Sequence, residues 1–149
     1  MSLEHEIEGK LRETFKEKIL EVKIPREHRM FVSIPLAQVK EVISYLKENL
    51  GITHITTISA TDVGENIEVI YHLFSNGVSL NLRTFTPKEA PVVETVTDIL
   101  PGAVLYEREA QDMLGLKFEG HPDPRRLILP EEWPEGVYPL RKDWSPKEG

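Results

Sequence analysis

A hairpin turn at Asn76-Gly77 is the strongest local constraint on the fold of this chain. Both central residues of a type I′ turn need a positive φ, and Asn and Gly tolerate that conformation better than other residues. The run that follows, residues 78–85, alternates apolar and polar side chains, and the run before it, residues 67–75, is rich in β-branched and aromatic residues. These patterns predict two antiparallel strands joined by a tight turn.

Two helices are predicted before the hairpin. Residues 3–20 carry an apolar side chain at every fourth position, with Glu, Lys and Arg between them, which predicts an amphipathic helix. Residues 36–50 give the clearest helical pattern, with one apolar face and Gly51 in the position that ends a helix.

The other elements follow from shorter patterns. Three further strands are predicted at residues 19–25, 29–35 and 53–63. After Pro87 the strand-like pattern stops. Helices are predicted over about residues 90–100 and again over residues 104–114, the second ending at Gly115. Residues 116–149, called the strap below, are proline-rich and are predicted to be extended and irregular.

The order of elements predicts an α+β fold: a mainly antiparallel sheet with helices on one face and an extended, proline-rich C-terminal strap. A length of 149 residues favours a single domain. Within it we expect an α+β core domain over residues 1–105, and a signature helix with an extended docking segment over residues 106–149.

Charge and cysteine content exclude several classes of function. The net charge of −7 and the lack of a long basic run argue against nucleic acid as the main partner. Because the chain has no cysteine, it forms no disulfide and holds no thiolate-bound zinc or iron–sulfur cluster. The charged first residues do not resemble a signal peptide, and no apolar run is long enough to span a bilayer. Few Asn and Gln residues and many Glu, Lys and Arg residues are typical of thermophiles.

His121 and Asp123 are the first candidates for chemistry. A metal site would need further ligands converging on His121, and the other histidines have no ligand-like spacing. A local turn explains the residues 120–123 more simply, because Gly120 permits an unusual backbone angle and Pro122 fixes the next. A small hydrolase that uses His121 with Asp123 stays open as an alternative.

The paired acids and the arginines are weaker candidates. Glu107 with Glu109, and Glu131 with Glu132, are too close in sequence to face one another on a helix, so a solvated or salt-bridged role is expected. Four cations of the strap have the chemistry to grip a phosphate or carboxylate, or to pair with carboxylates of a partner protein: Arg125, Arg126, Arg141 and Lys142. No glycine-rich phosphate loop precedes a helix here.

The helix predicted over residues 104–114 has two kinds of face. Its apolar side is expected to pack on the domain through Tyr106, Ala110, Met113 and Leu114. Arg108 and Asp112 lie four residues apart on another face, next to Glu109, and predict an organised charged surface. Proline-stiffened chain loses little entropy on binding, so this surface and the strap predict a docking site for another protein.

These residues also carry a resemblance. The runs "EREAQDMLGLKFEGHPDPRR" and "YPLRKDW" resemble the signature of the 30 kDa (C) subunit of respiratory complex I, a family that includes the corresponding subunit of energy-converting membrane-bound [NiFe] hydrogenases. Leu114 stands where the family often has Phe, and Pro124 where Leu is common. The resemblance covers the chain from the first helix to Trp144.

The resemblance implies a subunit that holds no cofactor of its own and lies in the peripheral arm, at the cytoplasmic face of the membrane. Its partners would be a large subunit, of the nickel–iron or the quinone-site type, and iron–sulfur subunits that carry the electrons, with the membrane reached only through partners. The short chain, the composition and Leu114 favour an archaeal-type membrane-bound hydrogenase over a complex I-type or sulfur-reducing complex.

The predicted subunit interface comprises Glu107, Arg108, Glu109, Asp112, Gly115, Gly120, His121, Pro122, Asp123, Arg125, Arg126, Arg141, Lys142 and Asp143. Its arginines and Lys142 are expected to pair with carboxylates of the large subunit, so Arg126→Ala should weaken assembly before it changes redox chemistry. Apart from the hydrolase, the other alternative is an adaptor unrelated to redox chemistry.

Overall fold

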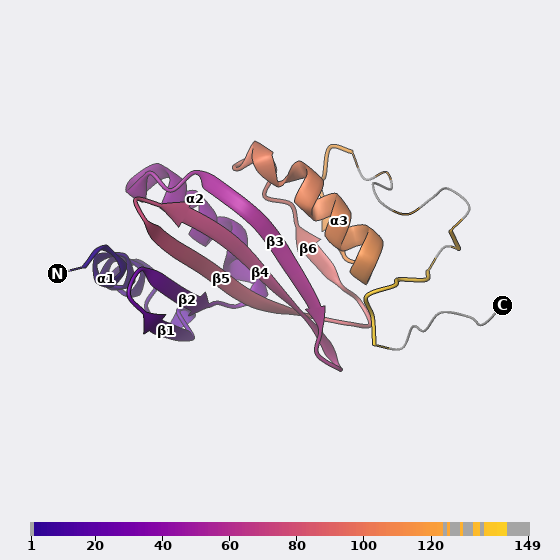
Figure 1. The fold of residues 1–149 in the computed structure, drawn as a ribbon, viewed down its shortest axis with the longest axis horizontal. Helices are drawn as coiled ribbons and strands as arrows, with labels where there is room; N and C mark the ends of the chain where they lie inside the picture. The colour runs from indigo at the N-terminus through magenta and orange to yellow at the C-terminus, as the bar shows by residue number, and fades with distance from the viewer. Residues whose placement is uncertain (1, 124, 126–128, 130–132, 135, 143–149) are drawn as a thin grey trace.

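The computed structural model describes residues 2–123, 125, 129, 133–134 and 136–142. It is an α+β fold built on a five-stranded sheet, as the sequence predicts (Figure 1). The strand order is β1-β2-β5-β4-β3, and the neighbours are antiparallel except β2 and β5, which run parallel. The strands are β1 (Glu21–Arg26), β2 (Arg29–Ser33), β3 (His54–Asp62), β4 (Asn66–Ser75) and β5 (Val78–Pro87).

The predicted hairpin lies at the centre of this sheet. Ser75 of β4 pairs with Val78 of β5, and the two residues between them have positive φ, 49° at Asn76 and 82° at Gly77. These angles are the ones that a type I′ turn requires. The Asn-Gly pair therefore sets the register of the two longest strands.

In the described residues, three α-helices accompany the sheet: α1 (Leu3–Phe15), α2 (Val39–Leu50) and α3 (Val104–Leu114). Single 3₁₀ turns adjoin them at Lys16–Lys18, Leu36–Gln38 and Pro101–Ala103. Helix α1 is shorter than predicted, because Lys16 has a φ of 51° and breaks the helical repeat. Both α2 and α3 end at a glycine in the left-handed conformation, Gly51 and Gly115, as the sequence predicts. No helix in the described ranges is long and apolar enough to cross a membrane.

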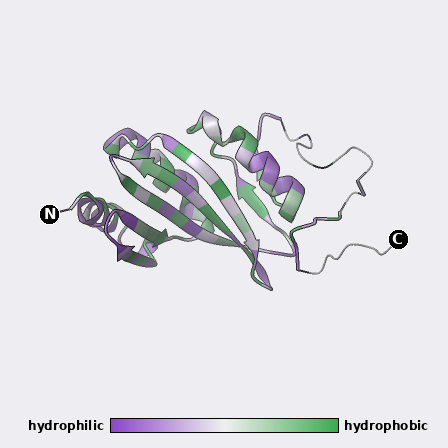
Figure 2. Cartoon of the chain, viewed as in Figure 1, coloured by the Kyte–Doolittle hydropathy of each residue, from purple (hydrophilic) through white to green (hydrophobic). Residues whose placement is uncertain are grey.

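One face of the sheet holds the core. In β4 the buried residues are Ile67, Val69, Tyr71 and Leu73, and residues between them are more exposed. They belong to one hydrophobic cluster that also contains residues of all three helices. Figure 1 shows α2 behind the sheet and α3 alongside β3, and Figure 2 shows apolar and polar residues alternating along the strands. The period of two places every second side chain toward the helices and the others on an open face.

The prediction of a helix over residues 90–100 is wrong. That segment contains a short strand, β6 (Val92–Glu94), which pairs in parallel with β7 (Lys117–Glu119), and then turns. Two consecutive valines suit a strand better than a helix, and pairing with a strand of the strap decides between the two. The β6–β7 pair ties the start of the strap to the domain, and Figure 1 shows β6 beside α3.

Candidate functional site

Helix α3 carries Glu107 into the interior of the chain. Its Oε1 accepts a hydrogen bond from the Thr95 hydroxyl at 2.6 Å, and its Oε2 accepts one from the Val96 N–H at 2.9 Å. Burial raises the pKa of the Glu107 carboxyl, although these two hydrogen bonds act to lower it. The predicted solvated or salt-bridged role of Glu107 is therefore wrong, since its fully buried carboxylate joins α3 to the segment after β6.

The charged face predicted on α3 is also smaller than expected. Asp112 is buried, and its Oδ2 accepts the backbone N–H of Leu129 in the strap at 3.1 Å. Only Arg108, which is partly covered, and Glu109, which is exposed, lie on the outer side as predicted. Helical spacing alone places Asp112 with Arg108, but the strap folds back over Asp112 and buries it. The predicted packed side is confirmed: Ala110 and Leu114 are buried, and Tyr106 and Met113 pack against the core.

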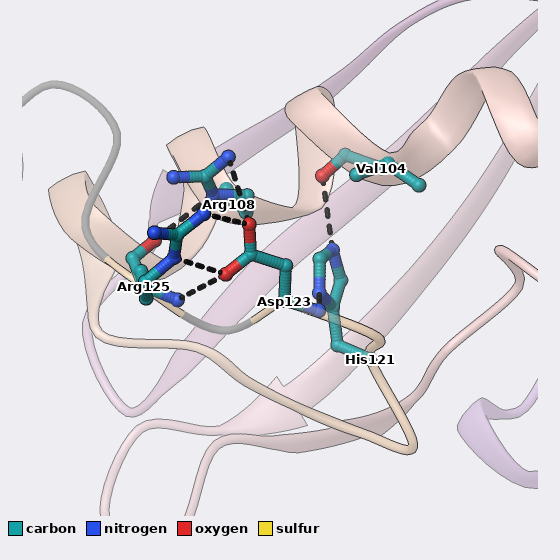
Figure 3. A network of polar contacts seen from close by, with 5 residues as sticks. All are labelled: Val104, Arg108, His121, Asp123 and Arg125. Carbon is teal, nitrogen blue, oxygen red and sulfur yellow. Dashed lines mark hydrogen bonds and ion pairs between the residues drawn. The ribbon is translucent and has the colours of Figure 1, made fainter.

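The turn after β7 is anchored on the first turn of α3 by His121 (Figure 3). The imidazole Nε2 donates to the carbonyl oxygen of Val104 at 3.0 Å, and Nδ1 accepts the backbone N–H of Asp123 at 2.9 Å. Gly120, which precedes this turn, has a φ of 84°, and a Cβ there would lie 3.1 Å from Cγ2 of Thr95. The predicted local role of Gly120 and His121 in a turn is confirmed. Pro122 is exposed beside them.

Asp123 is the centre of a charge cluster on the strap (Figure 3). The Arg125 guanidinium donates from Nε and Nη2 to the two carboxylate oxygens of Asp123, at 2.7 and 2.8 Å. Arg108 lies 3.6 Å from the same carboxylate and donates from Nε to the carbonyl oxygen of Arg125 at 2.9 Å. The Arg125 hydrogen bonds hold the pKa of the Asp123 carboxyl well below its usual range. Two arginines of the predicted interface are thus organised by one aspartate of the same chain.

Residues 138–141 of the strap are fastened to the C-terminus of α3. Arg141 donates from Nε to the carbonyl oxygen of Leu114 at 2.7 Å and lies over the Tyr138 ring, 4.7 Å from its centroid. The backbone N–H of Leu140 donates to the carbonyl oxygen of Met113 at 3.0 Å. These bonds satisfy carbonyl groups that the end of a helix leaves without an intrahelical partner.

Gly115 lies directly beneath this contact. It has a φ of 79°, and a Cβ built on it would lie 2.5 Å from Cε2 of Tyr138. Glycine is therefore required at this position for two reasons: the backbone has a positive φ, and there is no room for a Cβ. This agrees with the prediction that Gly115 makes a turn.

Asp62, the last residue of β3, is a second anchor for the strap. The sequence analysis did not identify this residue. Its buried carboxylate accepts hydrogen bonds from the backbone N–H of Gly64 and the backbone N–H of Lys142, both at 2.9 Å, and pairs with Lys88 Nζ at 2.6 Å. The Lys88 hydrogen bond is the main cause that lowers the pKa of the Asp62 carboxyl far below its usual range. An Asp two residues before a Gly signals a local turn, but no local signal points to Lys142.

In the described part of the chain, His121 and Asp123 face different partners. Across the described parts of the chain, no three His, Cys, Asp or Glu side chains come together in a way that could hold a metal ion. The Asp123 carboxylate faces Arg125 and Arg108, whereas His121 bonds to the backbone carbonyl of Val104 and to the backbone N–H of Asp123. Among the described residues, the Asp123 carboxylate therefore does not orient the His121 imidazole, as the hydrolase alternative would need. Four predicted residues lie outside the described residues: Arg126, Glu131, Glu132 and Asp143.

Comparisons with known proteins show similarity over most of the chain, and not only in the strap. The sequence profile of the family described as respiratory-chain NADH dehydrogenase, 30 Kd subunit, matches residues 32–148. The chain is 35% identical over 150 residues to the membrane-bound hydrogenase subunit beta of Pyrococcus furiosus, covering 96% of this chain and 87% of that protein. It is 33% identical over 135 residues to an F420H2 dehydrogenase subunit of Methanosarcina mazei, covering 88% and 85%.

A solved structure has a closely similar fold. A chain in the structure of the membrane-bound sulfane sulfur reductase, an archaeal respiratory membrane complex, superimposes with a TM-score of 0.84 at 28% identity. The match covers 95% of this chain and 85% of that one. Because the family match covers only residues 32–148, this likeness extends to residues that precede it.

Proposed function

The chain belongs to the family of the 30 kDa subunit of respiratory-chain NADH dehydrogenase, as its signature residues predict, and we propose that it docks the large subunit of a membrane-bound, ion-pumping redox complex. In this proposal the chain is non-catalytic and lies in the peripheral arm, at the cytoplasmic face of the membrane. A nickel–iron centre or quinone site and the iron–sulfur clusters belong to the partner subunits.

The observation that carries this proposal is the use of the signature residues. They fasten the strap to α3: His121 binds Val104, Asp112 binds Leu129, and Arg141 binds Leu114. Signature residues that shape a segment, without converging on a reaction centre, suit a surface made for recognition. A strap that is already held in position also loses less conformational entropy when a partner covers it.

The charged groups divide into two tasks in this proposal. Glu107 and Asp112 act from inside the chain, because both are buried and hydrogen-bonded. Arg125 presents its guanidinium at the surface, with an exposed fraction of 81%, while Asp123 holds its orientation. Such a fixed, exposed fork suits a carboxylate of the large subunit. We assign the same partner-facing task to Glu109, Arg126, Lys142 and Asp143.

Among complexes of this kind, we propose an archaeal-type membrane-bound [NiFe] hydrogenase, in which ferredoxin-linked hydrogen evolution drives ion translocation. The similarity to the hydrogenase subunit beta of P. furiosus over 96% of the chain supports this choice. The fold match to the sulfane sulfur reductase supports a sulfur-reducing complex as the second candidate. A complex I-type NADH or quinone complex is the third.

The test is co-purification from the native host. The tagged chain is purified from gently solubilised membranes, and the co-purifying subunits are identified with their nickel, iron and flavin. Nickel with a hydrogenase-type large subunit supports the first candidate. Iron with a large subunit that lacks the nickel-binding cysteines supports one of the other two. A chain that purifies alone from the cytosol contradicts the subunit proposal.

A second experiment tests docking through the strap. Arg126→Ala should lower the amount of co-purified large subunit, because removing one partner of a desolvated ion pair costs on the order of 2–5 kcal/mol of binding. Arg12→Ala is the matched control, since Arg12 is exposed on α1 and pairs only with its own-helix neighbour Glu8 among the described residues. A mutant complex that keeps all of its subunits but has no turnover would show that docking alone is the wrong account.

A further inference from the structure

Among the described residues, no helix lies on the face of the sheet opposite the core, and this face is called the open face. Its residues are set by the pairing register, which aligns Phe31, Asn81, His72 and Thr57 in one row across β2, β5, β4 and β3. Neighbouring rows add two aromatic side chains that are nearly half exposed, Phe74 at 46% and Phe85 at 44%. Figure 1 looks onto the sheet with α2 behind it. Here the open face means the residues Glu21, Lys23, Arg29, Phe31, Thr57, Ser59, Glu68, Ile70, His72, Phe74, Ser79, Asn81, Arg83 and Phe85.

The arginines of the open face are already ordered on an aromatic ring. The guanidinium carbons of Arg29 and Arg83 lie 5.2 and 5.5 Å from the centroid of the Phe31 ring. Arg83 also pairs with Glu68 at 3.4 Å, and Lys23 pairs with Glu21 at 3.0 Å. Among the described residues no ion pair joins Arg29 to a carboxylate. Arg29 is therefore the positive charge of this face that no carboxylate balances. The open face thus has one positive charge in excess, because Lys23 and Arg83 are balanced by Glu21 and Glu68, on a chain whose net charge is −7.

The polar groups at the centre of the open face satisfy one another. The Asn81 amide donates to the carbonyl oxygen of Met30 at 3.0 Å, which turns its Oδ1 toward Nδ1 of His72 at 2.6 Å. The opposite nitrogen of His72, Nε2, lies 2.7 Å from the Ser59 hydroxyl. A partner that covered this row would leave none of these atoms without a hydrogen bond, so the cost of removing water from them is small.

We propose that the open face is a second docking surface, and that it binds a partner-subunit surface that presents carboxylate side chains between apolar ones. Ordered arginines and partly exposed aromatic rings are the residue types that dominate binding energy at protein interfaces. Arg29 supplies the fork for a carboxylate, and Phe31, Phe74 and Phe85 supply apolar contact. A second copy of the chain is a poor occupant, because it would bring a second excess positive charge and no excess carboxylate to pair with Arg29.

This inference rests on the proposed role as a subunit, and it adds a surface on the sheet to the one on the strap. The experiment uses the tagged full-length chain in its native host and measures co-purified partner subunits per tagged chain. Arg29→Glu should lower that ratio by about tenfold or more, since it replaces an attraction by a repulsion. Arg29→Lys should lower it less, because the charge stays and the planar fork is lost. Phe74→Ser should also lower it.

Two controls match these changes. Lys18→Glu makes the same charge reversal at an exposed residue after α1, and Leu20→Ser removes an exposed apolar side chain outside the five strands. Both should leave the ratio unchanged. Circular dichroism and thermal unfolding of each purified variant establish that the chain is folded.

The outcomes separate the two proposals. If the unchanged chain brings no partner with it, the proposed function fails and the open face has no assigned occupant. If the unchanged chain brings its partners and folded Arg29→Glu and Phe74→Ser bring the same amount, the open face is not an interface. If light scattering shows that the purified chain is a dimer and that Arg29→Glu is a monomer, a second copy is the occupant and the inference is overturned.

Discussion

The backbone N–H of Lys142 donates to Oδ2 of Asp62 over 2.9 Å, although the two residues are 80 positions apart in the sequence. The same carboxylate holds Lys88 and the turn at Gly64. It therefore joins the β3–β4 turn, the end of β5 and the end of the strap. A side chain outside the family signature thus holds Lys142, a residue of the signature, in place.

Asp62→Asn should loosen the end of the strap. The amide cannot pair with Lys88 and accepts the Lys142 N–H less strongly, so we expect a loss of about 1–3 kcal/mol in the free energy of unfolding at neutral pH. Trypsin should cleave faster after Arg141. Because the folded-state pKa of Asp62 is lowered, its stabilisation is full above the ordinary value of 3.8 and is lost as the pH falls through the folded value.

The measurement is chemical denaturation at several pH values, with limited proteolysis followed by mass spectrometry. Asp98→Asn is the control, because Asp98 makes an exposed ion pair with Lys40 and should matter by at most about 1 kcal/mol. Equal losses in the two variants would contradict a special role of Asp62.

Glu107 should respond differently to two substitutions. Glu107→Ala leaves the Val96 N–H and the Thr95 hydroxyl without their acceptor, and should cost about 1–3 kcal/mol of stability. Glu107→Gln keeps an acceptor for Val96 and adds no charge, so it should cost much less. Chemical denaturation of both variants measures these differences.

The pH dependence gives Glu107 a second test. Because burial raises its folded-state pKa, the folded chain binds this proton more tightly than the unfolded chain does. The contribution of the Glu107 carboxyl to stability is present below its ordinary pKa of 4.5 and is lost as the pH rises through its folded-state pKa. The stability of Glu107→Gln relative to the unchanged chain should therefore rise with pH above 4.5, whereas Glu109→Gln, at an exposed position, should show no such trend. A flat difference for Glu107→Gln would contradict the buried carboxylate.

Gly115 and Gly51 form a matched pair for substitution by alanine. Both end a helix with positive φ, 79° and 67°, but a Cβ at Gly51 meets nothing within 4 Å, whereas one at Gly115 collides with Tyr138. Gly51→Ala should cost about 1 kcal/mol for its backbone conformation alone. Gly115→Ala should cost roughly 1–3 kcal/mol more, because Tyr138 and Arg141 have to move.

Denaturation measures the cost in both variants, and co-purification measures the consequence for docking. Only Gly115→Ala should reduce the amount of bound large subunit. Equal costs in the two variants would mean that Tyr138 does not rest on Gly115.

The parts of the fold that could be predicted are those decided by neighbours in sequence. The Asn76-Gly77 turn, the strands on either side and the ends of α2 and α3 at Gly51 and Gly115 depend on the φ angles that single residues allow and on apolar spacing. The family signature identified the chain for a related reason, because its residues lie in two short contiguous runs. The turn at Gly120 and His121 is equally local.

The parts that could not be predicted depend on segments that meet only in the folded chain. Residues 90–100 have an ambiguous local pattern, and β7 converts part of them to strand by offering backbone hydrogen bonds. Glu107 and Asp112 look like surface acids on a helical wheel, but Thr95, Val96 and Leu129 cover them and supply donors.

The sequence by itself determined the family, the α+β class and the hairpin, because these depend on residue type and on spacing between near neighbours in the sequence. Tertiary structure alone decided which carboxylates are buried, where Asp62 meets Lys142 and which face of the sheet stays open. The physical reason is that burial and hydrogen-bond partners are properties of distance in space, and a single sequence gives no measure of the distance between residues that lie far apart along the chain.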